Sequence, residues 1–274
     1  MKKQITVFAI LLLVGISSCK KDNNGQPLPY HGPSGFIKSI TVSDTAGYVV
    51  TTSSYSYDSQ SRLVQITEVV HSPTPDTLFY RFEYSPSRVT VNRMIAPDTY
   101  ISEKIIYDLN PAGLAGSCTV MNFLQSQDTI LELIESCQYD SEGYLAIKAS
   151  NYYGASSQTT ASYEVVNRNY VSTTWTFPQS GTTGKNNYTY DPGHVSTIGN
   201  DNVGLPFLGK SSYNPMIKAI DDSTNIERGS CTYQYDGNNR ISRITVRGYS
   251  FEVNGAWYSL PEPMTHEVVD YTYY

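Results

Sequence analysis

Tyr55-Ser-Tyr-Asp-Ser-Gln-Ser-Arg-Leu-Val-Gln-Ile-Thr67 is the stretch that decides the fold, because its pattern returns twice more in this 274-residue chain. The second copy is Cys137-Gln-Tyr-Asp-Ser-Glu-Gly-Tyr-Leu-Ala-Ile147, and the third is Tyr233-Gln-Tyr-Asp-Gly-Asn-Asn-Arg-Ile-Ser-Arg-Ile-Thr245. Shorter fragments stand at Tyr107-Asp108 and Tyr190-Asp191-Pro192-Gly193. A unit that recurs along a chain predicts a series of similar supersecondary structures.

Each copy predicts a β-hairpin. Alternating aromatic and β-branched residues before the Asp favour a half-buried strand. The Asp carboxylate can accept a nearby backbone N–H and so begin a turn. Ser61, Gly143 or Asn239 follows four residues after the Tyr. Gly and Asn tolerate a positive φ, so we expect a left-handed residue there, with Ser61 the least suited of the three.

The second strand of each hairpin leaves a question of phase. Leu63 and Ile66 are three residues apart, as are Ile241 and Ile244, so in a regular strand the two members of each pair face opposite sides. Either both faces of the sheet are partly covered or a bulge re-phases the strand. We favour one buried face and a second face coated by aromatic side chains.

These hairpin motifs resemble the tyrosine-aspartate (YD) repeats of Rhs-type shell proteins. Together with the N-terminus described below, the chain resembles a family of Bacteroidota lipoproteins of unknown function with a porin-like β fold. The segment Leu208-Gly-Lys-Ser-Ser-Tyr-Asn-Pro-Met-Ile-Lys218 is also similar to theirs. The resemblance implies a fold and a location, and it brings no catalytic motif.

The rest of the chain predicts an all-β protein. From Phe36 onward strands and turns alternate, and Asp128–Glu135, although apolar enough for a helix, is expected to pair with the stretch before it. We predict an antiparallel meander of successive hairpins that forms a large curved sheet or an open, barrel-like (porin-like) fold. Residues 34–274 make one domain, and the loops 179–187 and 198–210 are expected to be its softest parts.

The N-terminus predicts a lipoprotein. Residues 1–18 have the positive start and short apolar core of a signal peptide, too short to span a bilayer comfortably. They end in Ile16-Ser-Ser-Cys19, a lipobox-like sequence, so Cys19 is expected to carry acyl chains after cleavage. Residues 19–33 are rich in Pro, Gly and Asn and predict a flexible tether. An ordinary secretory signal is the alternative.

Charge and anchor together indicate the location and the partners. Removing the leader takes two of the 19 basic residues and none of the 25 acidic ones, so 17 against 25 leaves a formal charge of −8. An acidic surface argues against nucleic acid as partner. We expect outer-membrane anchoring through the lipid and an envelope protein or a glycan as partner. An acidic cluster after the Cys directs the resembling lipoproteins to the cell surface; here Lys20-Lys21-Asp22 follows, so the periplasmic and cell-surface sides both stay open.

The cysteines leave two alternatives. With a turn at 125–128, Cys118 and Cys137 lie nearly opposite each other on adjacent strands, and a disulfide would suit an oxidising compartment. The other interpretation is that Cys118, Cys137 and Cys231 are small buried hydrophobic residues.

The sequence shows no motif for catalysis, metal binding or a cofactor. The four histidines, His31, His71, His194 and His266, lie at no metal-ligand spacing and are expected at the surface. Asp58, Asp108, Asp140, Asp191 and Asp236 recur with their turns, so turn formation explains them. We expect a protein that is not an enzyme and has no metal or cofactor.

Aromatic side chains are the feature most open to a binding role. The chain has 24 tyrosines, and rings on a sheet face can stack on sugars or aromatic ligands. The candidate residues are Tyr152, Tyr153, Trp175, Trp257 and Tyr258. Sheet coverage by good strand formers is the simpler interpretation.

The sequence therefore predicts a lipid-anchored envelope protein that acts as a non-catalytic binding or scaffold module. One alternative is a glycan-binding or glycan-acting protein, which two carboxylates beside an exposed Trp in a cleft would favour. The other is an integral outer-membrane barrel, which would need lipid-facing apolar residues at alternate positions along its strands.

Overall fold

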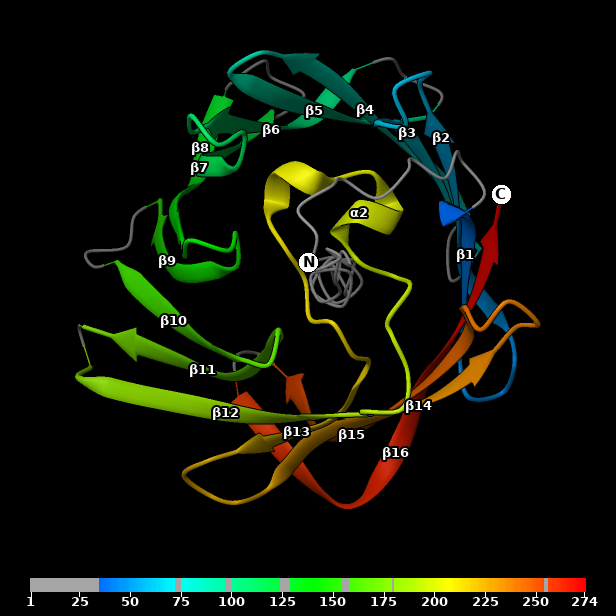
Figure 1. The fold of residues 1–274 in the computed structure, drawn as a ribbon, viewed down its shortest axis with the longest axis vertical. Helices are drawn as coiled ribbons and strands as arrows, with labels where there is room; N and C mark the ends of the chain where they lie inside the picture. Colours follow the sequence, from blue (N-terminus) through cyan, green and yellow to red (C-terminus); the bar gives the residue numbers. More distant parts are fainter. Residues whose placement is uncertain are drawn as a thin grey trace, which may run out of the picture.

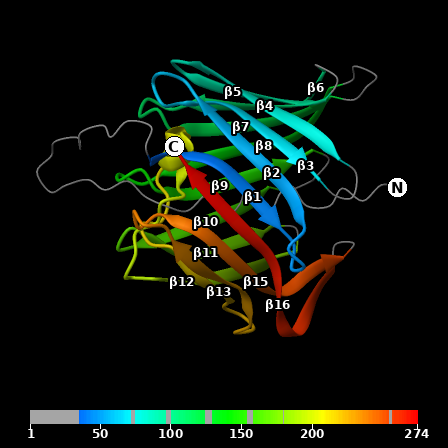
Figure 2. The ribbon, with the colours of Figure 1, turned by 90° about the vertical axis from the view of Figure 1, so that its right-hand side faces the viewer.

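The chain folds into a closed barrel of sixteen antiparallel strands. The computed structural model describes residues 35–71, 75–96, 100–123, 129–153, 158–178, 180–253 and 256–274, without the side chains of 249–253 and 256–266. Every strand pairs with its neighbours in sequence, and β1 pairs with β16 to close the ring. Figure 1 looks down the barrel and Figure 2 shows it from the side. The predicted antiparallel meander is confirmed, and its ends meet.

The strands alternate with turns along the whole described chain. Their bounds are β1 Ile37–Ser43, β2 Val49–Tyr57, β3 Leu63–Val70, β4 Asp76–Ser85, β5 Arg88–Ile95, β6 Ile101–Leu109, β7 Ala115–Phe123, β8 Thr129–Tyr139, β9 Leu145–Tyr152, β10 Thr159–Val166, β11 Asn169–Phe177, β12 Thr182–Tyr190, β13 Met216–Asp221, β14 Glu227–Tyr235, β15 Ile241–Val253 and β16 Ala256–Tyr273. The apolar stretch that begins at Thr129 is a strand, as predicted. No helix among the described residues is long and apolar enough to cross a membrane.

The repeated Tyr-Asp motif forms the predicted turns. Asp58 Oδ1 accepts the N–H groups of Gln60 and Arg62 at 2.9 Å, and Asp236 does the same for Asn238 and Arg240. The expected left-handed position has φ of 60° at Ser61, 90° at Gly143 and 60° at Asn239. Because turns of a meander alternate between the two ends, these turns lie at one end of the barrel, together with the chain ends Gly35 and Tyr274. We call this end the plugged rim.

Asp108 corrects the prediction for the repeat aspartates. It lies inside β6 and pairs with Arg88 on β5, with 2.7 Å between Arg88 Nε and Asp108 Oδ1. Asn110, two residues later, forms that turn instead and accepts the N–H groups of Ala112 and Leu114. Asn and Asp share this short side-chain oxygen, so either residue can begin the turn.

A bulge in the second strand resolves the question of phase. The pairing of β2 with β3 shifts between Ser56 and Tyr57, so that Leu63 and Ile66 both join the interior cluster. The same shift occurs in the Tyr139 and Tyr235 hairpins. The expected aromatic-coated second face is therefore wrong: the hairpin tyrosines and the aliphatic residues share the inner face.

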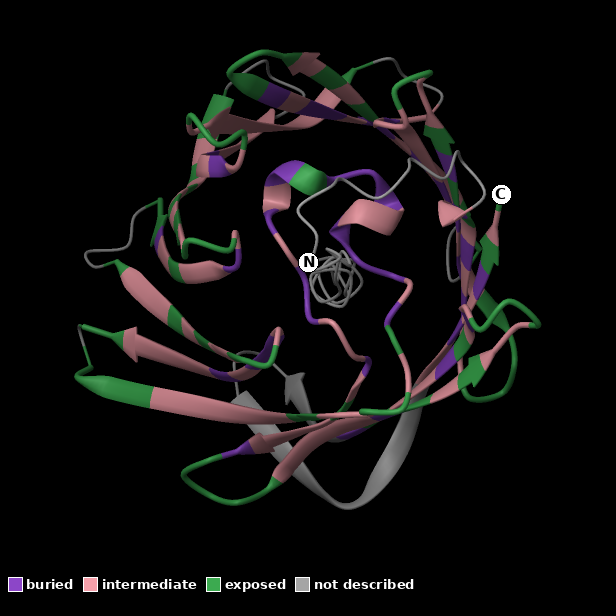
Figure 3. Cartoon of the chain, in the orientation of Figure 1, coloured by how far each residue is buried: buried purple, intermediate pink, exposed green. Residues whose placement is uncertain are grey.

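The outer face is polar. Alternate residues of each strand point away from the interior cluster, and the outward positions include Thr52, Ser54, Ser56, Arg81, Glu83, Lys185, Thr232, Gln234, Arg243, Thr245, Asp270 and Thr272. Ion pairs lie across this face, such as Arg243 with Asp270. Apolar strand residues are exposed as well: Val49, Ile130, Ile134, Ile147, Val166, Phe177 and Ile217 are each 37–45% exposed. The apolar cluster thus lies on the inner side of the barrel, and Figure 3 shows buried residues both in the wall and in the segment inside the ring.

The connection between β12 and β13 folds back into the barrel. Residues 191–215, which we call the plug, carry the short helix α2 (Asn200–Val203) and the 3₁₀ turn η2 (Pro206–Leu208), seen in yellow inside the ring in Figure 1. Ile198, Val203, Leu205 and Phe207 are buried against the inner faces of the strands. The prediction that 198–210 is one of the softest parts is wrong, because this segment packs inside the barrel. Most of the other predicted soft loop, 179–187, belongs to strand β12.

Backbone hydrogen bonds tie the plug to the surrounding turns. Lys210 N donates to Gly143 O at 2.9 Å, Tyr213 N to Arg168 O at 2.9 Å, and Leu63 N to Gly204 O at 3.4 Å. The Thr197 hydroxyl accepts Ile241 N at 2.9 Å. The plug therefore meets hairpins from opposite sides of the ring.

Tyrosine hydroxyls connect successive hairpins at the plugged rim. Tyr57 donates to Ile37 O and Tyr84 donates to Leu63 O, each at 2.8 Å, and Tyr273 donates to Ile241 O at 2.7 Å. Burial raises the pKa of Tyr84, so the hydroxyl stays protonated and acts as a donor. Among the Tyr-Asp tyrosines, Tyr57 satisfies the carbonyl of Ile37 in this way and Tyr190 that of Tyr170.

Two glycines with positive φ provide a test of the plug's fit. A Cβ on Gly204 (φ +79°) would lie 2.9 Å from Leu63 N, whereas a Cβ on Gly47 (φ +84°) would meet nothing within 4 Å. Both alanine variants suffer the backbone strain of about 1 kcal/mol or more. We expect Gly204→Ala to lower the free energy of unfolding by a further 1–3 kcal/mol or so, through overpacking. Equal losses for Gly204→Ala and Gly47→Ala in urea denaturation would contradict this packing.

Candidate functional site

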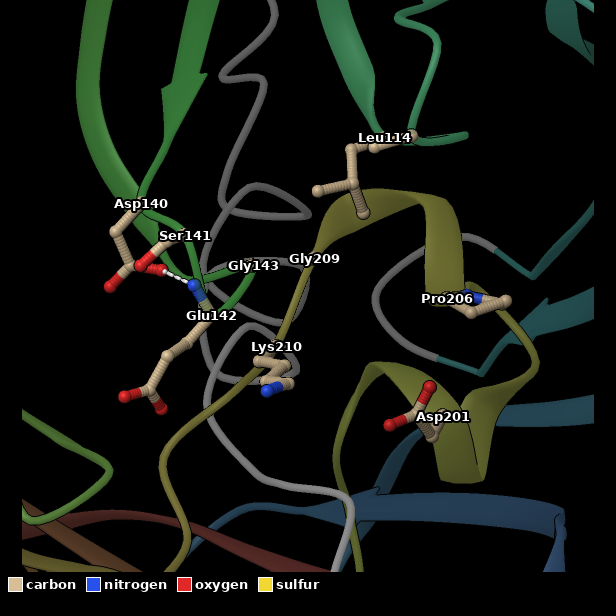
Figure 4. A pocket seen from close by; sticks show the side chains of 10 residues that line it. Leu114, Asp140, Ser141, Glu142, Gly143, Asp201, Pro206, Gly209 and Lys210 are labelled. Carbon is tan, nitrogen blue, oxygen red and sulfur yellow. Dashed lines mark hydrogen bonds between the residues drawn. The ribbon is translucent and has the colours of Figure 1, made fainter. Parts of the chain in front are cut away.

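A pocket opens at the plugged rim between the plug and two hairpin turns. It has a volume of about 400 Å³, within the range of small-molecule sites. Its walls come from the β6–β7 turn, the β8–β9 turn and the plug, and Figure 4 shows its side chains. The lining residues are Ala112, Leu114, Asp140, Ser141, Glu142, Gly143, Asp201, Pro206, Gly209 and Lys210.

The YD turn builds one wall. Asp140 Oδ1 accepts the N–H groups of Glu142 and Tyr144, each at 2.9 Å, and Gly143 N donates to Asp140 O at 3.1 Å. These bonds hold the Asp140 carboxylate in the turn. Glu142 occupies an exposed position of the same turn, so its carboxylate can contact solvent or a ligand.

The plug builds the facing wall. Lys210 N donates to Gly143 O, and Tyr170 Oη donates to Lys210 O at 2.9 Å, so the backbone of Lys210 is fixed from two sides. Its ammonium lies 5.3 Å from the centroid of the Tyr144 ring. Asp201 comes from α2, and Figure 4 shows Lys210 between Asp201 and Glu142. The lining therefore carries charges of both signs.

The chemistry of this pocket is recognition by charge and shape. Three carboxylates and one ammonium give the lining a formal charge of −2, and Ala112, Leu114 and Pro206 add apolar surface. Among the described residues, no group of three His, Cys, Asp or Glu side chains is placed to hold a metal ion. The lining suits a small ligand that carries charge.

A second cluster of polar side chains lies where the chain enters the plug. His194 Nδ1 is 2.6 Å from Asp191 Oδ2, and the His194 ring stacks on Tyr235 with 4.1 Å between centroids. Hydrogen bonds, first from Gly193 N and then from His194, lower the pKa of Asp191. His194 was expected as a surface imidazole; it is half-exposed, and it also links the plug to β14. The Asp-Pro-Gly-His sequence after a repeat Tyr was the signal for this contact.

The inner wall also holds a buried carboxyl group. Glu68 on β3 is 6% exposed and its Oε1 has no hydrogen-bond partner among the described residues. Burial raises the pKa of Glu68, and the nearby charge of Arg93 opposes that shift. Glu68 lies on the inner face, opposite Ser53 and Leu78.

The structure has Cys118, Cys137 and Cys231 as free thiols, so the disulfide considered between Cys118 and Cys137 is absent. Cys118 lies opposite Glu135, which places Cys137 two residues further along β8. Diagonal neighbours have Cα atoms about 7–8 Å apart, beyond the usual span of a disulfide. Burial, with Glu135 adding to it, raises the pKa of Cys118 to about 12 and that of Cys137 to about 11.

The aromatic candidates do not gather at one place. Tyr152 and Tyr153 are 53% and 73% exposed at the end of β9. Trp175 is half-buried on β11, and its indole lies over Gly184 of β12, where a Cβ would come within 2.4 Å. The side chains of Trp257 and Tyr258, and all of Cys19, lie outside the described residues. The pocket at the plugged rim was not predicted as a site.

Comparison with known proteins supports the fold. No protein-family model and no curated protein matches the sequence. A crystal structure of a porin-like protein from Bacteroides uniformis is similar, with TM-score 0.61 and 15% identity, over 87% of this chain and 98% of that one. A porin-like protein from Bacteroides vulgatus matches with TM-score 0.54 and 11% identity, over 87% and 98%. At these identities the likeness shows the fold alone. The chain has a porin-like barrel fold.

Glu68 gives a prediction for stability against pH. A carboxyl group whose folded pKa is raised favours folding below its unfolded value of about 4.3 and loses that contribution as pH rises through the folded pKa. Glu68→Gln keeps the shape without the charge. We therefore expect the stability of the variant, relative to the unmodified protein, to increase between pH 4 and pH 7 in urea denaturation. Glu142→Gln, at an exposed turn, is the control, and the same increase in both variants would contradict the burial of Glu68.

Proposed function

We propose that this protein is a lipid-anchored envelope protein whose barrel stands in water and acts as a non-catalytic binding module. The observation that carries the proposal is a mostly polar outer face, with the apolar cluster inside the barrel at the plugged rim, where the plug covers it. A transmembrane barrel needs the opposite arrangement, with an apolar band facing lipid. In this proposal the acyl chains on Cys19 attach the protein to the membrane, and the outer face of the barrel does not enter the bilayer.

The roles of the turn carboxylates support the non-catalytic part. Asp58, Asp140 and Asp236 each accept two backbone N–H groups of their own turn. Buried tyrosines donate to backbone carbonyls at the rim. These groups are occupied by the fold, and the pocket at the plugged rim offers charged and apolar groups to a ligand.

The glycan-acting alternative draws little support from the aromatic residues. It would need a pair of carboxylates beside an exposed indole in a cleft. Trp175 lies against Gly184 on the inner wall, and the carboxylates of the pocket come from the β8–β9 turn and the plug. We propose an envelope protein or the membrane itself as the partner, at the outer membrane on either its periplasmic or its cell-surface side.

The outer face predicts behaviour in solution. A chain that starts at Asp22 lacks the leader and the acylated Cys19, and it keeps every described residue. We expect it to remain monomeric in buffer without detergent, because most of its outward strand positions carry hydroxyl, amide or charged groups. Sedimentation velocity is the measurement. Aggregation that detergent reverses would indicate a lipid-facing barrel and would overturn the proposal.

Cys19 gives a separate prediction for the anchor. In cells fed a clickable fatty acid, the unmodified protein should take up label and fractionate with membranes. Cys19→Ala should lose the label, because the thioether needs the thiol. Cys231→Ala, at a buried cysteine on the inner wall, is the matched control and should keep it. Equal labelling of the Cys19→Ala and Cys231→Ala proteins would refute lipidation at Cys19.

A further inference from the structure

The pocket at the plugged rim brings charges of both signs into one lining. The Lys210 ammonium comes from the plug, and the carboxylates of Glu142 and Asp201 come from a hairpin turn and from α2. A ligand with one charge would satisfy one set and repel the other. A zwitterion with an anionic and a cationic group at short spacing can satisfy both.

The hydrogen-bond donors and acceptors of the lining indicate which charged groups the zwitterion carries. Lysine offers N–H donors and no acceptor, so its natural partner is a phosphate or a carboxylate. Glu142 and Asp201 are acceptors, so the cationic end of the ligand must donate. A primary ammonium has three N–H donors, whereas a quaternary ammonium has none and is usually held by a cage of aromatic rings. The lining therefore favours a primary amine over a choline group.

The apolar part of the lining fits the remainder of such a ligand. Leu114 and Ala112 come from the β6–β7 turn, and Pro206 from the plug. They give surface on which short carbon chains can pack beside the charged ends.

The position of the pocket points to the source of the ligand. Gly35, the first described residue, lies at the plugged rim, where its carbonyl accepts Asn202 Nδ2 at 3.5 Å. Asn202 is next to Asp201 of the pocket. Cys19 is 16 residues before Gly35, and a flexible chain of that length has an average span of roughly 20 Å. A lipid on Cys19 would thus keep this rim close to the bilayer.

We propose that the pocket binds the phosphoethanolamine headgroup of a membrane phospholipid. Lys210 contacts the phosphate, and Glu142 with Asp201 accepts hydrogen bonds from the primary ammonium. This inference rests on the proposed lipid anchor for the orientation of the rim. With the anchor in place, a pocket of low affinity is enough to be occupied, because tethering raises the effective concentration of headgroups at the rim. Binding would set the plugged rim against the bilayer and turn the opposite rim outward.

The test uses the chain from residue 19 with Cys19→Ser, which has no acyl chains. Its co-sedimentation is titrated with vesicles of phosphatidylcholine, of phosphatidylcholine mixed with phosphatidylethanolamine, and of phosphatidylcholine mixed with phosphatidylglycerol. We expect half-saturation at about tenfold less lipid with phosphatidylethanolamine, a ratio that one charge-assisted hydrogen bond can supply. Lys210→Gln and Asp201→Asn should each bring binding to the level of phosphatidylcholine alone.

Matched controls separate the pocket from general charge effects. Lys185→Gln, on the outer face of β12, removes one ammonium away from the pocket and should leave the preference unchanged. Lys210→Gln keeps the backbone bond to Gly143, and an unchanged thermal unfolding curve would show that it folds.

Three results would overturn the proposal. The first is equal binding to all three vesicles. The second is a preference for phosphatidylglycerol that Asp201→Asn leaves intact, which would indicate simple attraction of anions. The third is saturation of the pocket by free phosphoethanolamine, seen by NMR, without binding to the phosphatidylethanolamine vesicles, which would assign a soluble ligand. The tested chain carries no acyl group. These results therefore leave the proposed lipid anchor at Cys19 and the proposed water-exposed barrel untouched, and both have their own tests.

Discussion

The width of the barrel is the constraint on which the rest of the structure depends. Sixteen strands enclose an interior that side chains from the wall cannot fill, yet the inner face at the plugged rim is apolar. The plug supplies the missing packing. Ile198, Val203, Leu205 and Phe207 are all buried, and about 1.5–3 kcal/mol for each gives roughly 6–12 kcal/mol. That sum is comparable with the net stability of a whole domain, so the plug is part of the core.

The repeat explains how one rim can hold the plug. The units at Asp58, Asp140 and Asp236 place an acidic turn at the edge, and tyrosine hydroxyls such as that of Tyr57 lie just inside it. The Tyr57 hydroxyl satisfies the carbonyl of Ile37 on the neighbouring strand, and the turns offer backbone groups to the plug, as Gly143 does for Lys210. The pocket is a consequence of this arrangement, because it lies where two such turns and the plug meet. The outer face takes no part in this packing, and it carries the hydroxyl and charged residues.

The sequence predicted the local features and missed the distant ones. The turn at Asp58, the left-handed Ser61 and the succession of strands follow from neighbouring residues. Residues 198–210 were interpreted as a soft loop because their Gly, Asn and Pro content is that of a loop. Their burial depends on partners far along the chain, such as Ile241 for Thr197 and Gly35 for Asn202. Bulges misled the face assignment, since one extra residue reverses the side to which a strand's residues point.

The candidate site likewise combines residues that the sequence singled out locally with contacts between distant segments that it did not indicate. Asp140 and Glu142 belong to a recognised repeat, and Lys210 to a segment similar to other lipoproteins, but nothing local indicates that the three line one pocket. Cys118 and Cys137 show how far a turn position alone can guide pairing. Cys118 lies opposite Glu135, so Cys137 is two residues further along β8.

A central claim of this account is that the outer face of the barrel stands in water while the chain is attached to a membrane. Spin labels at Thr245 and Thr232, paired outward positions on β15 and β14, test it most directly in lipidated protein on vesicles, with the three free cysteines replaced. We predict that a water-soluble nickel complex relaxes both labels more strongly than dissolved oxygen does. Stronger relaxation by oxygen at both positions would place the strands in lipid and contradict the account.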